Sequence, residues 1–208
     1  MINMNSKKLV AVSIICFSAL YLISYSTLSF FIDSTIALLI VSLLFSAAAS
    51  YSLMFFLLSR FLIPNLGFTK SKMPKKLPKN ISLVIRHLMK KSRSKYEYLK
   101  SVYNYLTTKY HGKRNTILKN PDLLFNKNLN NIWAKKGFLP CHTFNYLTRL
   151  LLVKSRIFND HEIKIKHSFL NFSIHQYMEI KVKNKWLKLD PWAHGIGIKF
   201  GDYARFFR

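Results

Sequence analysis

The sequence of 208 residues predicts an α+β domain that follows a hairpin of two membrane-spanning helices. Two uncharged apolar runs near the start predict the hairpin. Further along the chain, apolar residues first recur at helical spacing and then alternate with polar residues as in strands. Helices followed by strands are typical of the α+β class. We therefore divide the chain into an anchor (residues 1–64), a basic linker (65–80) and a folded domain (81–208).

The predicted anchor consists of residues 9–31 and 36–59, which contain no charged side chain. As a helix, each run would be roughly 35 Å long, enough to cross a hydrocarbon core of about 30 Å. A cleaved signal peptide is an alternative for the first run, because Lys7 and Lys8 precede it. A buried hairpin of a soluble protein is a second alternative. The length of both runs favours a membrane anchor.

Flanking charge predicts the orientation of this anchor. The loop between the runs has no Lys or Arg, whereas basic residues flank both outer ends, at Lys7, Lys8, Arg60, Lys70, Lys72, Lys75, Lys76 and Lys79. The positive-inside rule then predicts a multi-pass protein of the cell membrane with its folded domain in the cytoplasm. The basic linker would contact anionic lipid.

The chain is strongly basic, with a formal net charge of +25. Such a charge favours anionic neighbours such as lipid headgroups or nucleic acid. The other interpretation is a solvated, lysine-rich surface. Because the sequence has no recognised nucleic-acid-binding motif, we expect no specific nucleic-acid partner.

Apolar spacing predicts the helices of the domain. The clearest pattern lies in residues 95–110, and shorter patterns in 81–89 and 141–153 predict two more helices. Residues 111–131 are rich in Asn and Lys, and we expect mostly loop there, with a helical turn near Leu123.

Strict alternation in residues 162–166, 177–182 and 186–189 predicts three strands, with a turn at Asn184 and Lys185 between the last two. We expect these strands to form an antiparallel meander. The tail that follows, residues 195–208, is apolar enough to pack on the sheet, and a frayed terminus is the alternative.

Three residues in these elements suggest nucleophilic catalysis. Cys141 begins a predicted helix, whose N-terminus favours a thiolate. His175 begins one strand and Asp190 ends the next, so an antiparallel pair would bring the two side by side. A thiol, an imidazole and an orienting carboxylate form a catalytic triad. We therefore predict that Cys141, His175 and Asp190 meet in one cleft.

The order of these motifs resembles the transglutaminase-like superfamily. The resemblance covers residues 96–192 and is most specific in HQYMEI (175–180) and WLKLDPW (186–192). Two features depart from the family pattern. The nearest preceding glycine is Gly137, four residues before Cys141 instead of two, and Tyr177 replaces the usual Trp.

This resemblance implies a papain-like core in which the Cys-bearing helix packs on an antiparallel sheet. It also implies acyl transfer through a thioester, with a protein or peptide substrate and no cofactor. Cys141 would attack a peptide or isopeptide amide, His175 would relay the proton, and Asp190 would orient His175. Water would give hydrolysis and an amine would give cross-linking. Asn131 and Trp133 are candidates for the second oxyanion donor, beside the N–H of Cys141.

Three other functions compete with this prediction. A catalytically inactive module could bind a partner or anionic lipid at the membrane, and the basic domain could bind nucleic acid. Metal binding is the third, because several histidines are available, namely His142, His161, His167, His175 and His194. The sequence lacks the usual spacing of zinc ligands, so we expect no metal site.

Overall fold

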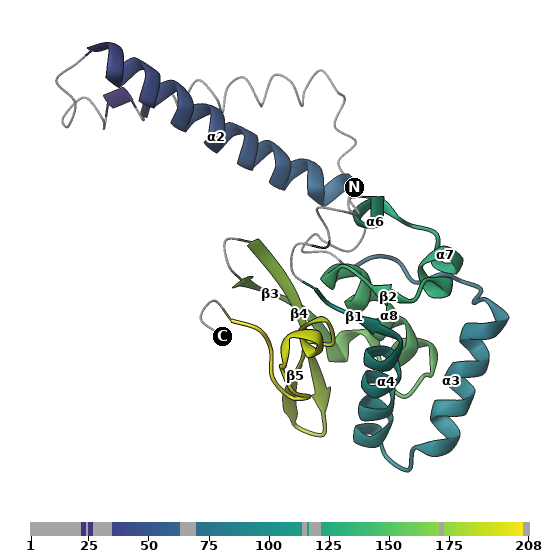
Figure 1. The fold of residues 1–208 in the computed structure, drawn as a ribbon. Coiled ribbons are helices and arrows are strands. Elements are labelled where there is room, and N and C mark those ends of the chain that lie inside the picture. The colour runs from purple at the N-terminus through teal and green to yellow at the C-terminus, as the bar shows by residue number, and fades with distance from the viewer. Residues whose placement is uncertain are drawn as a thin grey trace. The chain divides into compact units, whose positions relative to one another are not determined.

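The computed structural model describes residues 22–23, 25–26, 35–62, 70–113, 116, 122–170 and 173–205 (Figure 1). The chain divides into two compact units, Met1–Phe61 and Leu62–Arg208. The second unit contains the mixed helix and strand structure and all three residues of the predicted triad.

The described part of the first unit consists mainly of helix α2 (Thr35–Leu62). No helix within the described ranges is both long enough and apolar enough to cross a membrane. The predicted transmembrane hairpin and the multi-pass membrane location are therefore wrong. Buried hydroxyl side chains interrupt the apolar run in α2, where the Ser46 hydroxyl donates to the carbonyl of Ser42 at 2.7 Å. Most of the first predicted span, 9–31, lies outside the described residues.

Three longer helices form much of the second unit: α3 (Lys79–Lys91), α4 (Lys95–Lys109) and α8 (Cys141–Lys154). Ser94 caps α4 by accepting a hydrogen bond from the N–H of Glu97 at 3.1 Å. Helix α8 contacts α3 and α4 on one side and strand β4 (Ser173–Val182) on the other (Figure 1). It is therefore the central layer of the unit.

The sheet is an antiparallel meander in the order β3-β4-β5, with β3 at Ile163–Leu170 and β5 at Lys185–Leu189. The turn between β4 and β5 places Lys183 in the left-handed region, with φ of 54°. Met178, Ile180 and Leu189 are buried and pack into the same core as α4 and α8. The α+β class is confirmed at this level: helices and strands in small sheets.

Short elements complete the described part of the unit. They are β1 (Tyr110–His111), α6 (Asp122–Phe125), α7 (Leu129–Ala134), β2 (Gly137–Phe138), η1 (Asp160–Glu162) and η2 (Trp192–Ile196). Strands β1 and β2 pair in parallel, which joins the end of α4 to the segment leading into α8. The expectation of loop up to residue 131 is wrong where α7 begins, because Asn128 caps that helix by accepting from the N–H groups of Asn130 and Asn131.

Candidate active site

Cys141 is the first residue of α8, directly after Pro140. It is half-buried, and His142 and His175 lie close enough to its thiol to affect the pKa of the thiol. Burial by itself raises the pKa of this thiol, but the interactions with His142 and His175 outweigh burial and lower the pKa well below its ordinary value. The helix N-terminus also favours the anion. Cys141 is therefore placed where a thiolate is stable.

His175 lies near the start of β4 and is almost completely buried, at 3% exposure. Its Nε2 donates to Oδ2 of Asp190 at 2.7 Å, which leaves Nδ1 available to the thiol. The Trp192 ring packs against the imidazole, with centroids 4.9 Å apart. Burial lowers the pKa of His175, but the hydrogen bond with Asp190 and the interaction with Cys141 outweigh it and raise the pKa. These opposite shifts favour a thiolate–imidazolium pair.

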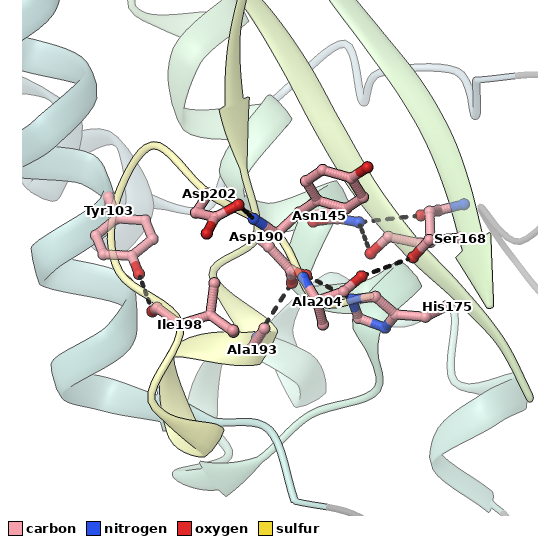
Figure 2. Close-up of polar contacts among 11 residues, drawn as sticks. Tyr103, Asn145, Ser168, His175, Asp190, Ala193, Ile198, Asp202 and Ala204 are labelled. Carbon is pink, nitrogen blue, oxygen red and sulfur yellow. Dashed lines mark hydrogen bonds and ion pairs between the residues drawn. The ribbon is translucent and has the colours of Figure 1, made fainter. Parts of the chain in front are cut away.

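Asp190 directly follows β5 and is buried, at 1% exposure. Besides His175, it accepts hydrogen bonds from two backbone N–H groups (Figure 2). The N–H of Ala193 in η2 donates to Oδ1 at 3.1 Å, and the N–H of Ala204 donates to Oδ2 at 3.0 Å. Buried carboxylates are stable only when hydrogen-bonded in this way. The carboxylate is therefore held on both of its oxygens.

Strand register explains why residues so far apart in sequence meet. Met178 of β4 pairs with Leu189, the last residue of β5. Asp190 directly follows Leu189, so it lies near the end of β4 that carries His175. Helix α8 is fixed to the same end of β4, because the Asn145 side-chain amide donates to the carbonyl of Gln176 at 2.8 Å (Figure 2). The structure thus brings His175 and Asp190 into contact, and it places Cys141 within electrostatic range of His175.

Sequence reasoning missed several parts of this site. His142 is buried and helps to lower the pKa of the Cys141 thiol, and its position next to Cys141 was the available signal. The donors from Ala193 and Ala204 are main-chain groups, for which the side chains give no signal. Asp190 therefore accepts two hydrogen bonds, from Ala193 and Ala204, that the predicted triad did not include.

The two candidates for the second oxyanion donor have other contacts. The indole of Trp133 stacks on Tyr105 of α4, with ring centroids 6.0 Å apart. Asn131 is exposed, and its N–H donates to Oδ1 of Asn128 at 3.3 Å. These contacts direct both residues toward other partners, so we assign the second donor to neither.

Within the described ranges, no cluster of three or more His, Cys, Asp or Glu side chains could hold a metal ion. The other histidines are dispersed: His161 lies in η1, His167 lies in β3, and His194 contacts the Tyr103 hydroxyl at 3.3 Å.

Comparison with known proteins identifies no relative. No protein family, no curated protein and no solved structure matches the chain. The resemblance to the transglutaminase-like superfamily therefore stays a prediction from the motifs around Cys141, His175 and Asp190.

Proposed function

We propose that this protein is a cysteine hydrolase or acyltransferase of the transglutaminase-like type that acts on peptide or isopeptide amides. One observation carries the proposal: a buried imidazole, His175, is hydrogen-bonded to Asp190 at 2.7 Å and lies close enough to the Cys141 thiol to lower the pKa of that thiol. A reactive thiol needs a lowered pKa and a base that an acidic group orients. Both requirements are supported by the contacts at this site.

The reaction begins with the thiolate of Cys141 attacking the amide carbonyl carbon, and a carbon–sulfur bond forms while the carbonyl electrons move to oxygen. The first-turn N–H groups of a helix have no intrahelical acceptor, so the N–H of Cys141 can donate to this oxyanion. The imidazolium of His175 protonates the leaving amine as the carbon–nitrogen bond breaks. A thioester remains on Cys141.

The second half of the reaction releases the acyl group. His175, now neutral, removes a proton from water or from an amine, which attacks the thioester carbon. Water gives a carboxylic acid, and an amine gives a new amide. The sulfur leaves as the thiolate, paired again with protonated His175. Asp190 keeps the ring oriented through Nε2 in both halves.

Thiol alkylation tests this proposal without a known substrate. The chain has one other cysteine, Cys16, which is replaced so that only Cys141 can react. In a Cys16→Ser background, we expect iodoacetamide to modify Cys141 rapidly well below the ordinary thiol pKa of about 8.5. In His175→Ala, the pH profile should shift upward and the rate at pH 6 should fall at least about tenfold. His161→Ala is the matched control, because that histidine is exposed in η1. Equal rates in wild type and His175→Ala would refute the triad.

Binding of an anionic partner without catalysis is the second candidate, favoured by the formal net charge of +25. It makes the opposite prediction for the nucleophile. If Cys141→Ala retains the cellular function of the wild type, the binding role is supported and the enzymatic proposal is not.

A further inference from the structure

Residues 201–205, here called the strap, run along the edge of the sheet next to the site (Figure 2). Gly201 forms an antiparallel bridge with Lys188 of β5. The Tyr203 ring stacks on Tyr177 of β4, with centroids 4.1 Å apart and planes 20° apart. Ala204 is fully buried. The strap is therefore packed on the sheet through both main chain and side chain.

Ala204 connects β3 to the carboxylate of Asp190. Its carbonyl accepts a hydrogen bond from the Ser168 hydroxyl of β3 at 3.0 Å, and its N–H donates to Oδ2 of Asp190 at 3.0 Å (Figure 2). That oxygen is the one that receives Nε2 of His175. Oδ2 of Asp190 thus accepts hydrogen bonds from both the strap, through Ala204, and the His175 ring.

We propose that the strap positions Asp190 for His175, with Ala204 as the positioning residue and Ser168 as its support. This inference rests on the proposed function, because it assigns the strap a role in the same triad. The terminal torsion of an Asp side chain is broad, so a carboxylate held by Ala193 alone could turn about it. The second N–H, from Ala204, fixes the direction of Oδ2. Hydrogen bonds to an ionised group are strong and directional enough for this role.

The stack of Tyr203 on Tyr177 holds the strap against the sheet and shields the hydrogen bond from Ala204 to Asp190 from water. Cations lie over the Tyr203 ring, with Nζ of Lys188 at 4.7 Å and the Arg205 guanidinium carbon at 4.8 Å from its centroid. Hydrogen bonds are stronger where water is excluded. Loosening Tyr203 should therefore weaken the contact of Ala204 with Asp190 even though Tyr203 does not touch the carboxylate.

The test uses the full chain in the Cys16→Ser background and two readouts, the pH profile of Cys141 alkylation and the pKa of His175 measured by NMR. Ala204→Pro deletes the N–H donor, and Tyr203→Ala removes the stack. For both we expect the alkylation profile to shift upward, the rate at pH 6 to fall about three- to tenfold, and the pKa of His175 to decrease.

Ser168 provides a graded series. Ser168→Ala should act in the same direction as the strap variants, and Ser168→Thr, which keeps a hydroxyl, should restore the wild-type profile. Ser168 lies opposite His175 in the strand register, so a substitution of Ser168 can also act on His175 directly. Ala204→Pro and Tyr203→Ala leave Ser168 unchanged, and they therefore separate the role of the strap from such a direct effect. Ser82→Ala is the matched control, since its hydroxyl also donates to a main-chain carbonyl, that of Pro78 at 3.2 Å.

The outcomes distinguish the two proposals. If His175→Ala shifts the profile but folded Ala204→Pro and Tyr203→Ala leave both readouts unchanged, the strap has no positioning role and the proposed function stands. If His175→Ala itself leaves the profile unchanged, the proposed function fails and the role of the strap fails with it. If Ala204→Pro does not fold, Tyr203→Ala and the Ser168 series decide the question.

Discussion

Asp190 shows how much a single buried side chain contributes to this molecule. Its carboxylate is 1% exposed and accepts hydrogen bonds from His175, Ala193 and Ala204. Each donor would be left without its acceptor if the carboxylate were removed, and a buried unsatisfied donor costs about 1–3 kcal/mol. Asp190 therefore supports both the chemistry and the stability of the domain.

We predict that Asp190→Asn weakens both properties. The amide NH₂ cannot accept hydrogen bonds, so one of the donors loses its partner, and we expect the free energy of unfolding to fall by about 1–3 kcal/mol. The charge that supports the imidazolium is also lost, so Cys141 should be alkylated more slowly at pH 6. Urea unfolding and alkylation rates measure the two effects. Asp122→Asn, at an exposed carboxylate in α6, should change neither.

At the scale of elements, Arg149 joins α8 to two other segments. Its Nε and Nη2 donate to the two carboxylate oxygens of Asp160 at 2.6 and 2.9 Å, and Nη1 donates to the carbonyl of Ser71 at 2.8 Å. Hydrogen bonding to Arg149 is the main reason why the pKa of Asp160 is below its ordinary value. The planar guanidinium makes this three-way contact possible.

Arg149→Lys should therefore destabilise the second unit while conserving its charge. We expect a loss of about 1–2 kcal/mol, limited by the solvent that reaches Asp160. Because the folded-state pKa of Asp160 is lowered, its contribution is present above an unfolded value of about 3.9 and is lost as the pH falls below it. The difference in stability between wild type and variant should shrink below pH 4. A difference that is constant from pH 7 to pH 2 would contradict this explanation.

Helix η2 and the end of β1 approach so closely that only glycine fits between them. A Cβ on Gly195 would lie 2.4 Å from the carbonyl oxygen of Gly112, and one on Gly112 would lie 2.2 Å from that of Trp192. Because Trp192 packs against His175, this approach also affects the site.

Gly195→Ala should push η2 away from β1 and cost about 1–3 kcal/mol of stability, as overpacking usually does. It should also slow Cys141 alkylation at pH 6 by moving Trp192. Thermal unfolding and the alkylation assay measure these effects. Gly197→Asn is the comparison variant: open space surrounds Gly197, so the only cost expected there is the backbone strain of its positive φ of 89°. Equal losses in both variants would show that the close approach is unimportant.

On the scale of the whole molecule, the core cluster of the described residues belongs to the second unit. The described core cluster extends from Ile81 to Ala204. We therefore predict that a chain beginning at Leu62 folds cooperatively and keeps the wild-type pH profile of Cys141 alkylation. Near-ultraviolet circular dichroism and alkylation rates test this. A chain that stays unfolded, or folds with an ordinary thiol, would show that the first unit is needed.

The success of sequence analysis also depended on scale. Periodicity predicted α4 and α8 to within a residue or two, because local spacing of apolar residues determines which face of a helix is buried. The parallel pair of β1 and β2 was missed, since two-residue strands joined across a long loop leave no periodic pattern. The membrane hairpin was wrong: within the described residues, no helix is both long enough and apolar enough to cross a membrane.

The three hydrogen bonds to Asp190 determine which group holds the proton that leaves the Cys141 thiol. The backbone N–H groups of Ala193 and Ala204 hold the Asp190 carboxylate in place. The carboxylate therefore cannot rotate with the His175 ring, and it cannot turn an oxygen toward solvent. In the proposed cycle, the proton taken from sulfur therefore rests on the ring and travels no farther inward. The departing amine would therefore receive its proton from His175, and Asp190 would remain a carboxylate throughout.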